Sequence, residues 1–338
     1  MNKKFLISVS ILAGIAALWM IFKFISIDEI FNAFGSASIK NIISFLVVSI
    51  ALICTLSWRW KVILKSQNIE VPFYNVIAYR LIGYGISYLT PAAKLGGEPV
   101  RAALLTRHGV KFPKALSSII IDKTIDFSTA ALFFFMGILT ILFSLTIPEG
   151  TGILLLVFAT VFLATMIFIY QRLSSGKGII KKIVHGLRLH KIKKLKLTER
   201  KIESFEKLII KFFREDKTDF LLTIGISLLA WVLMFLEYKF AGLIIGQDLS
   251  FLAIFLIVSF VGVAFLIPIP MAMGSLEASQ LAVFSMLAIK NASGVALAFV
   301  IRARDLMWSL AGMILLSYYG IKISSTLKKG YDIKDKTK

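Results

Sequence analysis

The sequence lacks most of what a soluble enzyme or a secreted scaffold needs. Its 338 residues include a single cysteine, Cys54, which excludes disulfides within the chain and any metal site built from several thiolates. Only 17% of the residues are charged, whereas soluble domains carry about a quarter. No phosphate-cradling G-x-x-x-x-G-K-[ST] motif, H-E-x-x-H motif or serine nucleophile elbow occurs, so neither an ATP motor nor these hydrolases are expected.

Long hydrophobic runs are abundant instead, because 58% of the residues are hydrophobic. Several runs exceed the roughly 18 residues that indicate a membrane span. The first run is longer than a typical signal-peptide core and has no A-x-A site behind it, which predicts a retained helix. The runs fall at 5–25, 41–58, 127–147, 152–170, 220–245, 249–267, 275–289 and 294–320.

The positive charge is placed as in a multi-pass membrane protein. Lysine and arginine total 39 against 19 acidic residues, and 15 of the 39 lie in the segment 172–217. Lys3 and Lys4 precede the first run, and more lysines follow the last run. The short connections expected on the opposite side of the membrane contain few basic residues. The positive-inside rule therefore predicts a plasma-membrane protein with both termini and the loop 172–217 in the cytoplasm. The apolar runs argue against nucleic acid as the partner of this charge.

Two apolar segments are broken by proline and glycine. Segment 80–106 is interrupted by Pro91 and Gly96–Gly97, and both of its flanks are basic, which predicts a re-entrant hairpin that opens from the cytoplasm. Segment 252–289 is interrupted by Pro268, Pro270 and Gly274 and lies between two runs that meet the outer face. Backbone broken at membrane depth is tolerated where protein covers it or where it lines a wet cavity.

The two hairpins match at an offset of 179 residues. Pro91 and Glu98 define this offset, because they fall on Pro270 and Glu277. The offset then also matches Gly83 with Gly262, Lys123 with Arg302, and Asp126 with Asp305. Because the hairpins open from opposite sides, the halves are related upside down. An inverted repeat with broken segments at matching places is typical of a transporter whose site lies near the midplane. We expect an all-α polytopic protein with about 6–8 transmembrane helices, two inverted repeats (1–147 and 148–338) and two re-entrant hairpins.

The charges inside the apolar segments are the candidate site residues. Glu98 and Glu277 follow small residues where a half-helix should begin, and helix starts attract anions. Arg302 lies about 12 Å into its span, where an unpaired charge costs at least ~2.5–3.5 kcal/mol. Simpler readings are that each glutamate caps its own helix and that the basic residues form structural ion pairs. Asp122 and Arg304 flank these positions, and Arg101 is either a phosphate ligand or a cytoplasmic anchor.

Basic amphipathic patterning marks the loop 172–217. Apolar residues recur there at helical spacing, including Ile202, Phe205, Leu208, Ile209 and Phe212. Helices of this kind lie on an anionic leaflet, so we expect this loop to be a membrane-surface anchor. The alternative is that the loop concentrates acidic lipid substrate near the protein.

The motifs TPAAKLGGEPVR (90–101) and PIPMAMGSLE (268–277) resemble a known family of flippase-like membrane proteins. That family includes the transmembrane region of bacterial lysylphosphatidylglycerol synthases, and the resemblance covers about 5–320. The second motif departs from the family pattern, because Met271, Ala272 and Met273 stand where more glycine is usual. The aminoacyl-transferase domain of the synthases is absent from these residues. The resemblance implies lipid translocation, with Glu98, Arg101 and Glu277 along the path.

Together these features predict a lipid flippase for an anionic or phosphate-linked head group, and not an enzyme. We expect no cofactor and no metal; the partners are membrane lipids, and a homo-oligomer is left open. The alternatives are a glycosyl- or phospho-transferase acting on a lipid carrier, with Asp122, Asp126 and Asp305 holding a metal or acting as base, and a small-solute transporter. The predicted substrate-binding residues are Glu98, Arg101, Lys123, Asp126, Glu277, Arg302 and Asp305, and the predicted hinges are Gly83, Pro91, Gly96, Gly97, Gly262, Pro268, Pro270 and Gly274.

Overall fold

The chain is a bundle of α-helices, and the residues described form no strand. The computed structural model describes residues 37–90, 95–144, 149–178, 199–264 and 269–319. The first predicted span, 5–25, and both termini lie outside these ranges, as do Pro91 and Pro268. The helices are α3 (Ile39–Ser66), α4 (Phe73–Leu89), α5 (Glu98–Leu105), α6 (Phe112–Ser144), α7 (Glu149–Ser174), α9 (Glu199–Arg214), α10 (Lys217–Ile244), α11 (Phe251–Ala264), α12 (Ser275–Met286) and α13 (Asn291–Tyr318), with short 3-10 turns η2 (Thr106–His108) and η5 (Pro270–Ala272).

Four of the described helices are long and apolar enough to cross a membrane: α3, α6, α7 and α10. An α-helix rises 1.5 Å per residue, so their spans of 23 to 32 residues exceed a hydrocarbon core of about 30 Å. α13 is also 28 residues long, but it carries Arg302, Arg304 and Asp305 in its middle. The all-α, multi-pass membrane fold expected from the sequence is confirmed.

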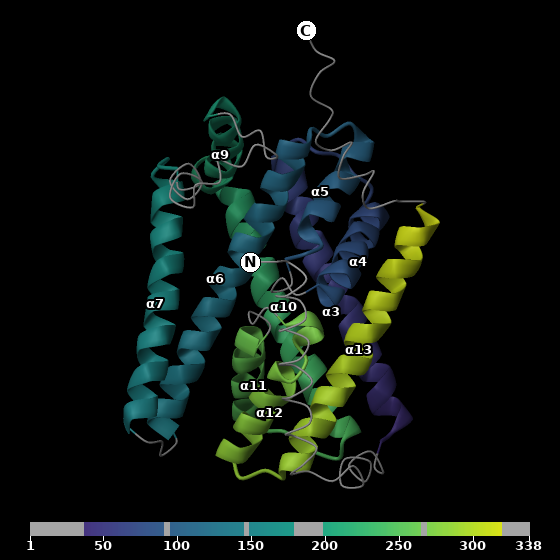
Figure 1. Ribbon diagram of the computed structural model, residues 1–338, viewed down its shortest axis with the longest axis vertical. Coiled ribbons are helices and arrows are strands. Elements are labelled where there is room, and N and C mark those ends of the chain that lie inside the picture. Colours follow the sequence, from purple (N-terminus) through teal and green to yellow (C-terminus); the bar gives the residue numbers. More distant parts are fainter. Residues whose placement is uncertain (1–36, 91–94, 145–148, 179–198, 265–268, 320–338) are drawn as a thin grey trace, which may run out of the picture.

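The broken segments occupy opposite ends of the bundle. In Figure 1, α4 and α5 lie in the upper part, whereas α11 and α12 lie in the lower part. The full-length helices α6, α10 and α13 run beside them from one end to the other. Four helices in each half begin at corresponding positions, separated by almost the same number of residues. The corresponding starts are Ile39 and Lys217, Phe73 and Phe251, Glu98 and Ser275, and Phe112 and Asn291.

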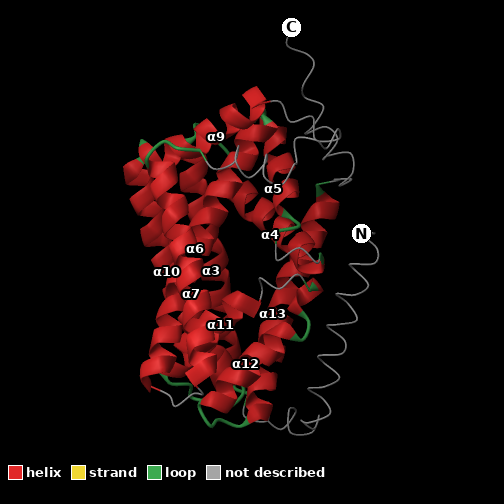
Figure 2. Cartoon of the chain, turned by 60° about the vertical axis from the view of Figure 1, so that its left-hand side comes forward, coloured by secondary structure: helices red, strands yellow, loops and turns green. Residues whose placement is uncertain are grey.

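Packing follows the same pairing. α3 packs along α10, α4 packs on α13, and α11 packs on α6. If α3, α4, α5 and α6 are matched with α10, α11, α12 and α13, the contact of α4 with α13 corresponds to that of α11 with α6. Figure 2 shows the bundle from a second side, with α5 near one end and α12 near the other.

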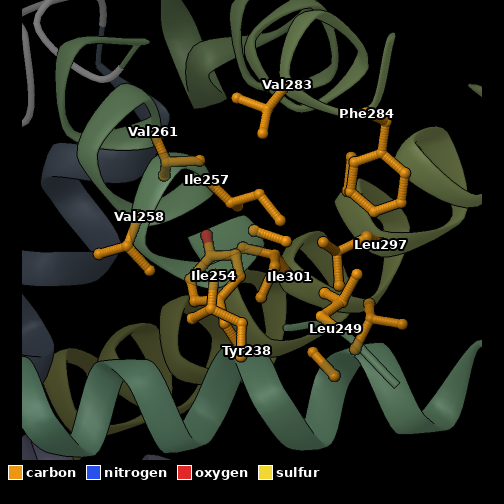
Figure 3. Close-up of a cluster of buried hydrophobic side chains, with 14 of the residues drawn as sticks. Tyr238, Leu249, Ile254, Ile257, Val258, Val261, Val283, Phe284, Leu297 and Ile301 are labelled. Carbon is orange, nitrogen blue, oxygen red and sulfur yellow. The ribbon is translucent and has the colours of Figure 1, made fainter. Parts of the chain in front are cut away.

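Each hairpin is buried in a core of its own. Trp60, Ile82, Val100 and Leu104 are fully or almost fully buried between α3, α4 and α5. Around α11 and α12, Figure 3 shows a second cluster that unites four helices; its labelled members are Tyr238, Leu249, Ile254, Ile257, Val258, Val261, Val283, Phe284, Leu297 and Ile301. Protein therefore packs around both of the broken segments.

Two glycines let the arms of the first hairpin touch. A Cβ on Gly97 would lie 1.9 Å from the backbone oxygen of Gly83, and a Cβ on Gly83 would lie 2.5 Å from the side chain of Arg101. We expect Gly97→Ala to lower the free energy of unfolding by about 1–3 kcal/mol, because the clash is with backbone that cannot turn aside. Gly225→Ala is the control, since its Cβ would meet nothing within 4 Å. Thermal unfolding in detergent would compare them; equal melting temperatures would contradict the close approach.

Helix α6 begins at Phe112, fifteen residues before the apolar run predicted at 127. The charges at 122, 123 and 126 interrupt the hydrophobic pattern, yet they lie inside the helix because other helices supply their counter-ions. α4 likewise begins at Phe73, earlier than the predicted start of the first hairpin at 80.

Helix α9 is amphipathic, as the loop pattern indicates, but protein covers its apolar face. Ile209, Phe212 and Phe213 are buried with Ile121 and Ile125 of α6 and Leu173 of α7. Phe213 also lies edge-on to Tyr170 of α7, with ring centroids 5.3 Å apart. The described part of the loop is therefore docked on the helical bundle through Ile209, Phe212 and Phe213.

Candidate functional site

A buried carboxylate, Asp122 on α6, gathers three arginines from three helices. Its Oδ1 accepts a bond of 2.9 Å from Arg59 Nε on α3. Its Oδ2 accepts bonds of 3.0 Å from Arg80 on α4 and 3.3 Å from Arg101 on α5. Asp122 is 0% exposed, and Arg59 and Arg101 are each 2% exposed. One carboxylate thus joins α3, α4, α5 and α6, the described helices between 37 and 144.

Glu98, Lys123 and Asp126 extend this network toward an open space. Lys123 Nζ lies 3.1 Å from Glu98 Oε1 and 3.8 Å from Asp126 Oδ2. Glu98 also binds Arg101 at 2.7 Å, and Asp126 binds Arg59 at 3.1 Å. The side chains of Lys123 and Asp126 are 22% and 41% exposed, so these two present their charge outside the network. The four residues predicted in the first half are therefore brought together.

The second half contains a matching pair, Glu277 on α12 with Arg302 on α13. Arg302 Nη2 donates to Glu277 Oε2 at 2.7 Å and to the carbonyl of Ala272 at 3.2 Å. Its Nη1 donates to the carbonyl of Met271 at 2.9 Å. Glu277 also accepts a 2.9 Å bond from the N–H of Gly274, so it caps its own helix as well as pairing. Arg302 ties the irregular turn at 270–272 to α13.

Arg304 and Asp305 form a third group with a carboxylate from α10. Arg304 contacts Glu237 through Nη1 and Asp305 through Nη2, the latter at 2.7 Å. Tyr84 of α4 donates its hydroxyl to Asp305 Oδ1 at 2.5 Å. Glu237 and Asp305 are both 0% exposed. This group joins the first hairpin to the helices of the second half.

A cavity of about 310 Å³ lies between these groups. Helices α3, α4, α6, α7, α10, α11 and α13 all contribute to its wall. Its charged lining consists of Arg59, Arg80, Lys123, Asp126, Glu237 and Arg304. Four cations thus face two carboxylates on the wall, while Asp122, Glu98 and Asp305 contact these cations from behind it. Ligand pockets usually occupy about 300–1,000 Å³, so the cavity is of ligand size.

The predicted site residues divide into lining and supporting groups. Lys123 and Asp126 line the cavity. Glu98 and Asp305 lie one contact behind it, through Lys123 and Arg304 respectively. Arg101 lies behind Arg80, with which it shares Asp122, and its guanidinium stacks on Trp60 at 4.0 Å. The pair Glu277–Arg302 is outside the cavity lining.

Several lining residues were not predicted to bind substrate. Arg59 lies between Trp58 and Trp60, a pattern typical of the membrane interface, and its buried role depends on Asp122 from a distant helix. Arg80 was counted among the basic flanks. Glu237 has no counterpart at the 179-residue offset, and its partner Arg304 becomes apparent only when α10 and α13 are placed together. The sequence does carry one signal for these residues, because a charged side chain inside a long apolar segment indicates a functional position.

The predicted hinge residues have different local settings. Gly274 has a φ of +81°, which favours glycine, and it precedes α12. Gly83 and Gly262 lie inside α4 and α11. Gly96 faces Thr90, with only 1.9 Å from the place of a Cβ to the threonine Oγ1. Pro270 begins the turn η5, while Pro91 and Pro268 are outside the described ranges.

The three aspartates of the transferase alternative do not come together. Asp122 and Asp126 are held by Arg59, and Asp305 is held by Arg304 on the other side of the cavity. Among the described residues, no group of three or more His, Cys, Asp or Glu side chains could hold a metal ion. Arginines hold both oxygens of Asp122. Arg59 and Lys123 hold those of Asp126, and Arg304 and Tyr84 hold Oδ1 of Asp305.

Comparison with known proteins places this architecture among membrane proteins. The family model described as the lysylphosphatidylglycerol synthase TM region matches residues 5–312. A UPF0104 membrane protein of Methanothermobacter thermautotrophicus is 24% identical over 336 residues, covering 95% of this chain and 97% of the relative. One from Pyrococcus horikoshii is 26% identical over 348 residues, covering 96% and 100%. One from Methanocaldococcus jannaschii is 30% identical over 166 residues, 48% of each chain.

Proposed function

We propose that this chain, which belongs to the lysylphosphatidylglycerol synthase TM-region family, moves a lipid with an anionic or phosphate-linked head group across the bilayer. The observation that carries the proposal is the charge of the cavity wall, where four cations face two carboxylates. Arginine and lysine are the usual ligands of phosphate oxygens, and arginine offers them a planar fork of donors. The wall presents more basic than acidic groups to a low-dielectric space, which favours entry of an anion. With Arg101, Asp122, Glu98 and Asp305 behind the wall included, the five basic groups are balanced by five carboxylates, so the cations are held in place without a large net charge.

The arrangement of the helices supports alternating exposure of that cavity. The equal spacing of helix starts and the paired contacts of α4 with α13 and α11 with α6 fit two inverted halves. We propose that α4–α5 and α11–α12 are re-entrant hairpins that open toward opposite faces of the membrane. Inverted repeats of this kind move one half against the other around a site near the midplane.

Charge distribution favours one orientation in the membrane. The end of the bundle that carries α5 and α9 in Figure 1 bears Lys65, Arg107, Lys111, Lys114 and Arg214. The opposite end, where α3 and α13 begin and α10 ends, bears Lys40, Lys239 and Lys290 as its described basic residues near helix ends. We propose that the basic end faces the cytoplasm of a plasma membrane, which agrees with the positive-inside rule. Membrane lipids are then the partners.

Reconstitution into liposomes tests the proposed activity. Fluorescent lipids with anionic, zwitterionic and polyprenyl-phosphate head groups would be followed by quencher accessibility, without ATP. We expect protein-dependent movement that is faster for the anionic and phosphate-linked heads than for the zwitterionic one. Movement of none of these lipids, with product formed only when a sugar donor is supplied, would favour the transferase and reject the flippase.

A further inference from the structure

The cavity wall changes from charged to apolar along one face of α6. Lys123, Asp126, Phe127, Ala130 and Phe134 all line it, at the three- and four-residue spacing of a single helix face. At 1.5 Å per residue the stripe from Lys123 to Phe134 is about 16 Å long. Its first turn is charged and its last two turns are apolar. Along α6 the wall therefore has a polar end at Lys123 and Asp126 and an apolar end at Phe134, while Glu237 and Arg304 add charge from α10 and α13.

The apolar end reaches the membrane-facing side of the bundle. Phe134 lines it from α6, Phe162 from α7, and Val258 and Gly262 from α11. Phe134 contacts the ring of Phe158 on α7 edge-on, with centroids 6.0 Å apart. Phe158 and the neighbouring Val161 are 51% and 60% exposed. Exposed apolar side chains on a membrane-spanning helix face hydrocarbon, so this end of the cavity lies next to the lipid chains.

The space at the apolar end is open at Gly262. A Cβ built on Gly262 would meet no atom within 4 Å. The matching position in the first half, Gly83, is instead filled by the side chain of Arg101, 2.5 Å from the place of its Cβ. The empty space beside Gly262 on α11 therefore belongs to this cavity, because the corresponding glycine on α4 has no such space.

We propose that the apolar end of the cavity binds the upper part of one hydrocarbon chain of the lipid whose anionic head group occupies the polar end. A charged wall that continues into an apolar wall matches an amphiphile, whereas a soluble anion would leave the apolar half uncovered. A volume of about 310 Å³ equals roughly ten water volumes, which leaves room for a head group and only the first carbons of a chain. The remainder of the chain leaves between α7 and α11 into the bilayer. This inference rests on the proposed function.

Photolabelling tests the chain site without requiring transport. The probe is phosphatidic acid with a diazirine near the head-group end of its acyl chain, bound to the full-length protein in detergent. Phosphatidylcholine with the same chain is the control lipid. We expect the phosphatidic acid probe to label residues on α6, α7 and α11 around Phe134, Phe162 and Gly262, and the phosphatidylcholine probe to label the outer face of α7 without that preference.

The decisive variant is Gly262→Phe, which places a ring in the open space. Gly225→Phe is the matched control, because Gly225 also has no neighbour within 4 Å of a Cβ and is exposed on α10. We expect labelling inside the cavity to fall about tenfold in Gly262→Phe, as for the exclusion of roughly two methylenes, and to be unchanged in Gly225→Phe. If Gly262→Phe fails to fold, Ala130→Phe fills the same end from α6.

The outcomes separate the two proposals. Cavity labelling that Gly262→Phe or Ala130→Phe removes supports the chain site, even when liposomes show no lipid movement, in which case only the flippase is rejected. Labelling confined to the outer face of α7, or cavity labelling unaffected by either folded variant, overturns the chain site. Lipid movement that persists in a folded Gly262→Phe protein with cavity labelling lost would show that the chain site is not needed for transport.

Discussion

Replacing Asp122 by alanine should destabilise the protein more than any other single substitution in the charged network. Three arginines from α3, α4 and α5 donate to this one buried carboxylate at 2.9 to 3.3 Å. Without it their guanidinium groups repel one another where water cannot screen them. Removing one partner of a buried ion pair costs about 3–5 kcal/mol, because a buried charge is left uncompensated. We expect loss of monodisperse protein, or a melting temperature in detergent lower by about 6 °C or more.

The matched control is Asp248→Ala. Asp248 pairs with Lys239 at the end of α10, and their side chains are 77% and 36% exposed. Exposed pairs contribute about 0–1 kcal/mol, so this variant should melt close to the wild type. Equal melting temperatures for the two variants would show that the arginines around Asp122 find other partners or water. Asp122 would then not be needed to hold α3, α4 and α5 on α6.

Reversing the charge of Lys123 should abolish lipid movement. Lys123→Glu would face Glu98 and Asp126, which lie 3.1 and 3.8 Å from the lysine Nζ, and it would remove a cation from the cavity wall. Disruption of a buried charge contact costs about 2–5 kcal/mol, so we expect the rate to fall about hundredfold or more. Lys239→Glu, at the exposed pair with Asp248, should leave the rate unchanged. The measurement is the initial rate for an anionic lipid in liposomes.

A charge swap distinguishes a structural ion pair from a binding residue. In the double variant Lys123→Glu with Glu98→Lys, the pair is restored with opposite polarity, so melting temperature should recover. Glu98 does not line the cavity, and a lysine there would not replace the lost cation. We therefore expect transport to stay low. Full recovery of transport together with stability would mean that the pair is only structural and would remove Lys123 from the binding site.

The fold was largely predictable because membrane spans leave a direct signal in the sequence. Runs of apolar residues lie within or across α3, α6, α7, α10 and α13, and Pro/Gly breaks mark the two segments that form α4–α5 and α11–α12. The helix α6 itself begins at Phe112, whereas the apolar run within it begins only at 127, because three charges at 122, 123 and 126 interrupt the hydropathy. Their burial depends on arginines from other helices, which hydropathy along one segment does not contain.

The candidate site was predictable only where the halves match. The 179-residue offset matched Glu98 with Glu277 and Lys123 with Arg302, and the structure shows that Glu98 pairs with Lys123 as Glu277 pairs with Arg302. Arg59, Arg80 and Glu237 are equally close to the cavity, but they have no charged counterpart at that offset. Each of these residues lines the cavity from one half only, so a search for matching positions does not reveal them.

Access to the cavity from both sides would show most directly whether one cavity carries a head group between the two membrane faces. Ala130 would be replaced by cysteine after Cys54→Ser, which removes the one native cysteine. A membrane-impermeant anionic thiol reagent would then be applied to sealed vesicles from either side. We predict labelling from both sides, slowed by anionic lipid. Labelling from one side only, or from neither in a folded protein, would contradict it.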